Sequence, residues 1–438
     1  MSIRQALMPW VSAALTSEAR LHRRRRLQET RRRLLGRPHQ ATCYLRLDDP
    51  WSWLLAQTLP TFADHFGLQL KPVTMLWLDA TMYPQPDMLA HLARIDAARL
   101  ARFHGMTFPA AANPPTEEAV LRASRQLIAA EGSDEYWPLF NQLAASLWQP
   151  GQPSTPSSLP ISSEQAWQLL VQRRENFLTE GHYLTATVHY AGEWYWGVDR
   201  LDHLAARLTA LTGIDSGSLP DYGAAKYLSV TPGETDQKRK LELFFSFRSP
   251  YSWLALGRTF QLVDRHRMQL VIRPVLPMVM RGLSVPRAKR MYILQDAARE
   301  ARLHEVPFGK ICDPLGAGVE NCMAVWPLAE QQGKLRSWLE TAAQHIWSRG
   351  SNTANPGTIV RLAEEAGLNT SKLRDALNRP DWRLEAEENR AAMMAAGSWG
   401  VPTFRLNDEM TIWGQDRLGL LEKLLLQPPE QDRGRASK

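Results

Sequence analysis

The segment Ser249-Pro250-Tyr251-Ser252 contains the residue types of this sequence that most directly suggest chemistry. Ser249 follows an apolar β-type run and precedes Pro250, which the first turn of a helix tolerates. Backbone N–H groups at the start of a helix favour anions. A serine hydroxyl there can donate a hydrogen bond to a bound thiolate and favour its ionised form. The other interpretation is that Ser249 serves only as the N-cap of the helix.

Three further segments contain residues that a ligand site could use. Lys289, Tyr292 and Asp296 fall on one face of a predicted helix, which is either a solvated face or a source of positive charge for a carboxylate. Pro402 leads a predicted strand, and its peptide bond is either an ordinary trans bond or a cis bond that marks a fixed turn. Asp416 opens the last predicted helix, either as a cap or as an acceptor for a ligand ammonium.

The elements that position these residues occur twice in the chain. Three pairs of segments match in order along the sequence, the first two at an offset of 200 residues and the third at a slightly larger one. In the second pair, seven of nine residues are identical. Such colinear matches indicate an internal repeat. The pairs are Asp49–Leu54 with Ser249–Leu254, Asp96–His104 with Asp296–His304, and Trp196–Leu201 with Trp413–Leu418.

Each half is predicted to run strand, helix, strand, a helical insertion, two short strands and a last helix. This is the element order of a thioredoxin-like unit with helices inserted into it. Such folds place a cis-proline facing the active site, here Pro402, and the residue before it, Val401, has backbone groups free to pair with an extended peptide. The predicted segments are an Arg-rich helical extension (1–38), a degenerate domain (39–212), a linker (213–238), a second domain (239–428) and a polar tail (429–438).

Four motifs of the second half, in this order, resemble the family of 2-hydroxychromene-2-carboxylate isomerases and kappa-class glutathione transferases. They are Ser-Pro-Tyr-Ser-Trp-Leu, Lys-x-x-Tyr-x-x-x-Asp, Gly-Val-Pro-Thr-Phe and Trp-Gly-Gln-Asp-Arg-Leu, and the resemblance covers about residues 238–426. The resemblance implies an α/β protein made of two thioredoxin-like (DsbA-like) domains, each with a helical insertion.

The resemblance also implies that glutathione is the cofactor and that the chain is an enzyme of the isomerase or transferase type. Ser249 would then be the catalytic residue that stabilises the glutathione thiolate for addition to an electrophilic, aromatic-derived substrate. The remaining roles concern binding: Val401, beside Pro402, would pair with the cysteinyl backbone, Lys289 would meet a carboxylate, and Gln415 and Asp416 would hold the γ-glutamyl end. Gln415 departs from the serine common in the transferases.

The first half departs from this pattern at most of these positions. Asp49, Leu89 and Ala186 stand where the second half has Ser249, Lys289 and Pro402. A carboxylate at position 49 would repel a thiolate. We therefore expect the first half to be non-catalytic and to pair with the second as a pseudo-dimer within the chain, while further oligomerisation stays open.

Charge and cysteine usage limit the kinds of partner and compartment that we expect. Residues 1–37 contribute +8 to a net charge of +7, so the basic character belongs to the N-terminal extension. A solvated helical arm is favoured over an anionic partner there, and the lack of aromatic residues among the arginines argues against nucleic acid. Three cysteines without a Cys-x-x-Cys motif favour a reducing, cytoplasmic location. We expect no membrane partner, and no cluster of residues has metal-ligand spacing.

Two other hypotheses compete with the enzyme. One is a non-catalytic binding or scaffold protein that keeps the thioredoxin fold. The other is a relative of the thiol-disulfide oxidoreductases, which the absence of cysteine at positions 249 and 252 disfavours.

Overall fold

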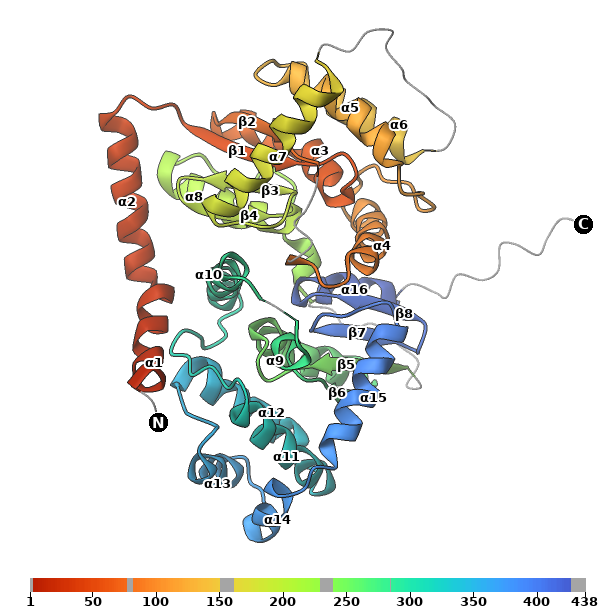
Figure 1. Cartoon of the computed structure of the whole chain (residues 1–438). Helices are drawn as coiled ribbons and strands as arrows, with labels where there is room; N and C mark the ends of the chain where they lie inside the picture. The colour runs from red at the N-terminus through yellow and green to blue at the C-terminus, as the bar shows by residue number, and fades with distance from the viewer. Residues whose placement is uncertain (1–2, 77–81, 150–160, 229–238, 284, 427–438) are drawn as a thin grey trace, which may run out of the picture. The chain divides into compact units, whose positions relative to one another are not determined.

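The structure is a computed structural model of all 438 residues, and it describes residues 3–76, 82–149, 161–228, 239–283 and 285–426. Part of the expected linker and the expected polar tail lie outside the described residues. The chain divides into two compact units, each built around one four-stranded sheet (Figure 1). One unit comprises residues 16–223 and 282–296, and the other comprises residues 1–15, 224–281 and 297–438.

The unit that holds the first sheet begins with α2 (Glu18–Leu34). Its sheet has the order β2-β1-β3-β4, with β1 and β2 parallel and the other pairs antiparallel. In chain order the elements are β1 (Gln40–Leu45), α3 (Pro50–Phe66), β2 (Gln69–Thr74), α4 (Pro86–His104), α5 (Glu117–Ala130), α6 (Tyr136–Trp148), α7 (Ser163–Glu180), β3 (Thr187–Tyr190), β4 (Glu193–Trp196), η2 (Val198–Arg200) and α8 (Leu201–Thr212).

The unit that holds the second sheet repeats this plan, with the order β6-β5-β7-β8. Its elements are α1 (Ile3–Thr16), η3 (Ala224–Lys226), β5 (Lys240–Phe245), α9 (Pro250–Arg265), β6 (Gln269–Pro274), η4 (Met278–Arg281), α11 (Ala317–Gln331), α12 (Leu335–Gln344), η5 (His345–Arg349), α13 (Pro356–Glu365), η6 (Thr370–Lys372), α14 (Leu373–Leu377), α15 (Trp382–Ala395), β7 (Thr403–Leu406), β8 (Met410–Trp413), η7 (Gln415–Arg417) and α16 (Leu418–Leu426). Helix α10 (Arg287–Leu303) supplies residues to both units.

The registers of the two sheets show the repeat in three dimensions. Gln40 pairs with Gln69 in the first sheet, and Lys240 pairs with Gln269 in the second, so both strands of the parallel pair keep the offset of 200 residues. The turn that leads into the third strand is repeated as well. The N–H of Gly197 donates to the carbonyl of Ala186, and the N–H of Gly414 donates to that of Pro402. These matches confirm the predicted α/β fold of two thioredoxin-like units.

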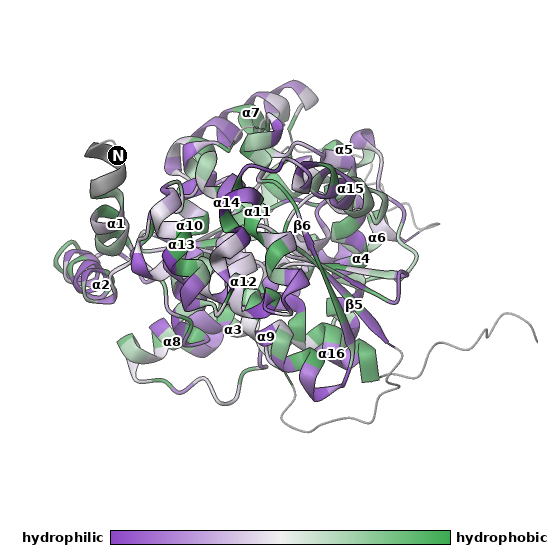
Figure 2. Ribbon diagram, turned by 90° about the horizontal axis from the view of Figure 1, so that it is seen from below, coloured by the Kyte–Doolittle hydropathy of each residue, from purple (hydrophilic) through white to green (hydrophobic). Residues whose placement is uncertain are grey.

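The central strands β1 and β5 are mostly apolar, apart from residues such as the buried Glu242, because helices cover both sheets on both sides. In β5, Leu241, Leu243 and Phe245 are fully buried, and so is Phe244 on the opposite face. Apolar residues line β5 and α16, as Figure 2 shows in green, whereas hydrophilic residues dominate α2. The buried strands give a rigid platform from which the loops at their ends present side chains.

Candidate functional site

Four residues separate the end of the central strand β5 from the start of helix α9, and the last of them, Ser249, is the N-cap of that helix. Its Oγ accepts a hydrogen bond from the N–H of Ser252 at 3.1 Å and donates one to the carbonyl of Val401 at 3.2 Å. The side chain is half-buried. The N-cap interpretation of Ser249 is thus confirmed. Its hydroxyl also faces the loop before β7, and its expected bond to a thiolate stays a prediction.

The loop before β7 brings Val401 and Pro402 to the same place. The bond between them is cis, as the second interpretation of Pro402 supposed. Thr403 holds the loop by donating to the carbonyl of Gly400 at 2.6 Å. Val401 packs against a buried cluster formed by Phe244, Val275 and Met393. Within the described part of the chain, the N–H of Val401 has no hydrogen-bond acceptor. The structure therefore brings together three of the predicted residues, and one backbone donor among them is unused.

The sequence interpretation missed an indole that holds the strand end before Ser249. Trp347 lies in η5, a π-helical turn, and its Nε1–H donates to the carbonyl of Phe247 at 3.1 Å. The first copy has the same bond, from Trp148 to the carbonyl of Leu47 at 2.9 Å. The offset between the two indoles is 199 residues, so the internal repeat was the signal that could have identified them.

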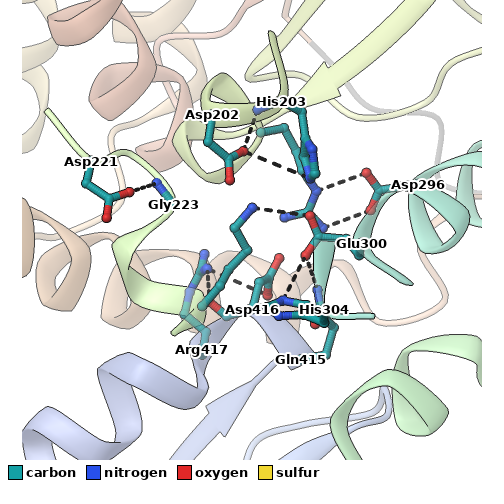
Figure 3. A network of polar contacts seen from close by, with 12 residues as sticks. Asp202, His203, Asp221, Gly223, Asp296, Glu300, His304, Gln415, Asp416 and Arg417 are labelled. Atoms are coloured by element: carbon teal, nitrogen blue, oxygen red, sulfur yellow. Dashed lines mark hydrogen bonds and ion pairs between the residues drawn. The ribbon is translucent and has the colours of Figure 1, made fainter. Parts of the chain in front are cut away.

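Gln415 is placed differently from its expected role. Its side chain is buried, and its Nε2 donates to Glu300 at 2.7 Å (Figure 3). Its Oε1 accepts from Arg258. Glu300 in turn pairs with Lys226 at 3.2 Å, and both of those side chains are fully buried. The amide of Gln415 is thus already used inside the protein, and its expected contact with a ligand stays a prediction without support in this geometry.

Asp416 follows in the same turn, η7, and is 7% exposed. Its carboxylate lies 3.6 Å from the guanidinium of Arg417, and Figure 3 shows these side chains together. Gly414 has a positive φ of 107°, and a Cβ at that residue would lie 2.6 Å from the Asp416 carboxylate. The glycine is therefore required for the approach of this carboxylate to the backbone.

Lys289 belongs to the unit that contains the first sheet. Its ammonium donates to the carbonyl of Met82 at 2.8 Å and lies over the rings of Tyr83 and Tyr183, 5.8 and 5.5 Å from their centroids. Burial lowers the pKa of Lys289 to about 8. Its contacts are with a carbonyl and two aromatic rings, so its expected carboxylate role stays a prediction that the geometry does not favour.

Asp49 occupies the first-copy position that corresponds to Ser249. It is buried, and its carboxylate accepts from the N–H of Trp51 at 3.2 Å and from the hydroxyls of Ser52 and Thr185, both at 2.7 Å. Thr185 stands where the second copy has Val401. Three internal donors thus satisfy the Asp49 carboxylate, which closes the position to an anionic ligand.

The described part of the chain offers few residues for metal or thiol chemistry. None of its groups of histidine, cysteine, aspartate and glutamate could hold a metal ion. The three cysteines are buried and unpaired, and burial raises the pKa of each thiol, to about 12 for Cys322. Among the described helices, none is both long and apolar enough to cross a membrane.

Comparison with known proteins places the second half in a family. Residues 240–426 match the model of the DSBA-like thioredoxin domain. Glutathione S-transferase kappa 1 of Rattus norvegicus is 30% identical over 206 residues, which cover 43% of this chain and 91% of that protein. A 2-hydroxychromene-2-carboxylate isomerase of Sphingobium xenophagum is 26% identical over 198 residues, 43% of this chain and 98% of the isomerase. A solved structure of such an isomerase aligns with a TM-score of 0.37 at 22% identity, over 42% of this chain and 94% of that one.

Proposed function

We propose that this chain, which belongs to the DSBA-like thioredoxin family that includes the kappa-class glutathione transferases, is a glutathione-dependent isomerase or transferase acting through Ser249. The observation that carries the proposal is the hydrogen bond from the Ser249 hydroxyl to the carbonyl of Val401, at the N-terminus of α9. In the free protein, these two groups satisfy each other. An extended peptide that carries a thiolate could replace both partners at once.

The exchange would proceed as follows. The cysteinyl backbone of glutathione would pair with the N–H and carbonyl of Val401 in the manner of an added strand. The Ser249 hydroxyl, released from the carbonyl, would donate to the sulfur. Together with the N-terminal N–H groups of α9, this bond favours the thiolate over the thiol, whose proton passes to solvent.

The thiolate would then attack an electrophilic carbon, forming a C–S bond while an electron pair moves into the conjugated system of the substrate. In an isomerisation, the former double bond rotates, the C–S bond breaks and the thiolate returns. In a transfer, the C–S bond persists in the product, and the displaced electron pair either takes a proton from solvent or expels a leaving group such as chloride. Either reaction uses the same preorganised donor, because the charge on sulfur is what the site stabilises.

We assign no ligand contact to Gln415 or Lys289. The amide of Gln415 is used by Glu300 and Arg258, and the ammonium of Lys289 is used by Met82 and two tyrosine rings. We propose instead that Gln415 holds η7 in place. Asp416, which is 7% exposed and whose carboxylate lies 3.6 Å from Arg417, keeps its expected contact with the ammonium of the γ-glutamyl group as a prediction only.

The test compares wild type with Ser249→Ala and Ser249→Thr. Three measurements apply to each: retention on immobilised glutathione, the pKa of bound glutathione from its thiolate absorbance, and conjugation of chlorodinitrobenzene. We expect Ser249→Ala to raise the thiol pKa and to lower kcat/KM by about 10²-fold, the usual effect of losing one preorganised donor. Ser249→Thr keeps a hydroxyl and should keep most of the activity.

Ser162→Ala is the matched control, because Ser162 also caps a helix but lies in the first-copy unit. Both alanine variants lose one cap, worth about 1 kcal/mol, so a general loss of stability would affect them alike. Absence of retention on glutathione, or turnover equal in wild type and Ser249→Ala, would refute the proposal. Retention without turnover would favour the binding protein that the sequence left as an alternative.

A further inference from the structure

Helix α2 has two faces of different chemistry. One face, formed by Leu21, Arg25, Glu29 and Arg32, is half-buried. The opposite face consists of Arg20, Arg23, Leu27, Arg31 and Leu34, which follow the helical spacing i, i+3, i+7, i+11 and i+14 and are all exposed. We call the second set the outer face of α2.

The half-buried face holds α2 to the rest of its unit. Arg25 donates two hydrogen bonds to the carboxylate of Glu193, at 2.8 and 2.7 Å, and Arg24 donates to the carbonyl of Gly192 at 3.4 Å. Glu193 also pairs with Arg207 at 3.1 Å. A bidentate arginine–carboxylate pair fixes the orientation of the two side chains as well as their distance. It therefore restricts rotation of α2 and keeps the outer face exposed to solvent.

The outer face carries positive charge that the described part of the chain does not neutralise. Arg20, Arg23 and Arg31 make no ion pair with any described carboxylate. The acidic residue in the middle of α2, Glu29, bonds to Arg32 and Arg33 instead, and the hydrogen bond from Arg32 lowers the pKa of Glu29 to about 2. The arginines of the outer face are thus available to an external anion.

Two large apolar side chains lie among these arginines. Leu27 is 62% exposed and Leu34 is 82% exposed, and they stand seven residues apart on the same face. Figure 2 shows how hydrophilic the remainder of α2 is. Surfaces that bind single-stranded nucleic acid place aromatic side chains between their basic residues, whereas a helix that lies in a lipid headgroup layer combines arginines with leucines that enter the acyl boundary.

We propose that the outer face of α2 binds the surface of membranes that contain anionic phospholipids. The arginines would meet the headgroup phosphates, and Leu27 and Leu34 would insert between the lipids. This contact lies on the surface of a membrane and needs no spanning helix. It departs from the expectations of a solvated arm and of no membrane partner, and it is independent of the proposed glutathione site.

The test is cosedimentation of the full chain with vesicles of phosphatidylcholine alone or mixed with phosphatidylserine. We expect binding only to the mixed vesicles, with a partition coefficient that falls as salt rises. Replacing Arg23 and Arg31 by Gln should lower the coefficient about 25-fold, since each arginine near an anionic surface contributes about fivefold. The double variant Arg361→Gln/Arg374→Gln is the control, because it removes the same charge from exposed positions of α13 and α14.

The variant Leu27→Gln/Leu34→Gln separates a membrane from a nucleic acid. It keeps every charge, so binding to vesicles should weaken severalfold while binding to a single-stranded RNA should not change. Failure of the wild type to bind the mixed vesicles would overturn the proposal. Equal loss of vesicle binding in the Arg361/Arg374 control would also overturn it. So would a Leu27→Gln/Leu34→Gln variant that binds both RNA and vesicles as the wild type does.

Discussion

The N-cap residue of the first helix after the central strand has a different role in each copy. Asp49 is buried under three internal donors, whereas Ser249 is half-buried and uses its one donor on a backbone carbonyl that a peptide could displace. The residue types alone distinguish a negatively charged carboxylate at position 49 from a neutral hydroxyl at position 249. The surrounding hydroxyls of Ser52 and Thr185 are what make Asp49 a closed structural element.

Lys289 gives a prediction about pH. Its folded pKa of about 8 lies below the ordinary value of 10.5, so the folded state loses the proton more readily than the unfolded chain does. The cost of burying the ammonium is fully present below pH 8, and it is relieved as pH rises from 8 toward 10.5. We therefore expect the stability of wild type to rise relative to Lys289→Met across that window, by on the order of 1 kcal/mol after allowing for partial solvent access.

Urea denaturation at several pH values measures this difference. Lys310→Met is the control, because Lys310 also lies over an aromatic ring, 4.7 Å from the centroid of Trp10, but is exposed. A pH dependence of the same size in the control variant would contradict the assignment to Lys289.

At the scale of elements, each copy fastens the end of its central strand with an indole from the inserted helices. Trp148 is the last residue of α6 and bonds to Leu47, and Trp347 lies in the π-helical η5 and bonds to Phe247. Each ring also packs on a phenylalanine, Phe108 or Phe308. The inserted helices thus support the turn that carries the N-cap residue.

The paired indoles allow a matched experiment. Trp347→Phe and Trp148→Phe each leave a buried carbonyl without its donor, so each should cost about 1–3 kcal/mol in the free energy of unfolding. Only Trp347→Phe should also weaken glutathione binding, because Phe247 lies two residues before Ser249. Titration calorimetry checks binding, and a similar loss of affinity in both variants would show that the effect is global.

At the scale of the whole molecule, the charge distribution is asymmetric. The first 37 residues contribute +8, and the rest of the chain sums to −1. The two helices of this extension attach to different units: Ser12 of α1 accepts from the N–H of Ile311 at 2.9 Å, and Arg25 of α2 pairs with Glu193. The extension is therefore bonded to both units at specific residues.

Limited trypsin digestion tests the attachment of α2. Arg25→Gln should speed cleavage within α2 about tenfold, since loss of a charge-assisted hydrogen bond of about 1.4 kcal/mol raises the population of the open helix by that factor. Arg26→Gln is the control, because this neighbouring arginine is exposed and makes no ion pair with the described residues. Equal cleavage rates in the two variants would contradict the role of Arg25.

Much of the architecture follows from the sequence alone. The repeat, the order of strands and helices, and the meeting of Ser249 with Val401 and Pro402 could all be predicted, because matched segments fold alike and strand ends bring their loops together. The partners of Gln415 and Lys289 could not be predicted, since an amide or an ammonium bonds to whichever buried group lies nearest. Those groups, such as Glu300, Arg258 and Met82, come from distant parts of the chain.

The sequence by itself therefore determined the duplicated fold, the family and the difference between Asp49 and Ser249, all of which depend on local patterns and residue types. Only the tertiary structure decided which polar groups are already satisfied. Internal donors satisfy the Asp49 carboxylate, and buried groups bond to Gln415 and Lys289. One face of α2 is held to its unit through Glu193. The physical reason is that a hydrogen bond or ion pair between segments far apart in the chain depends on their approach in space, which periodicity and motif spacing do not encode.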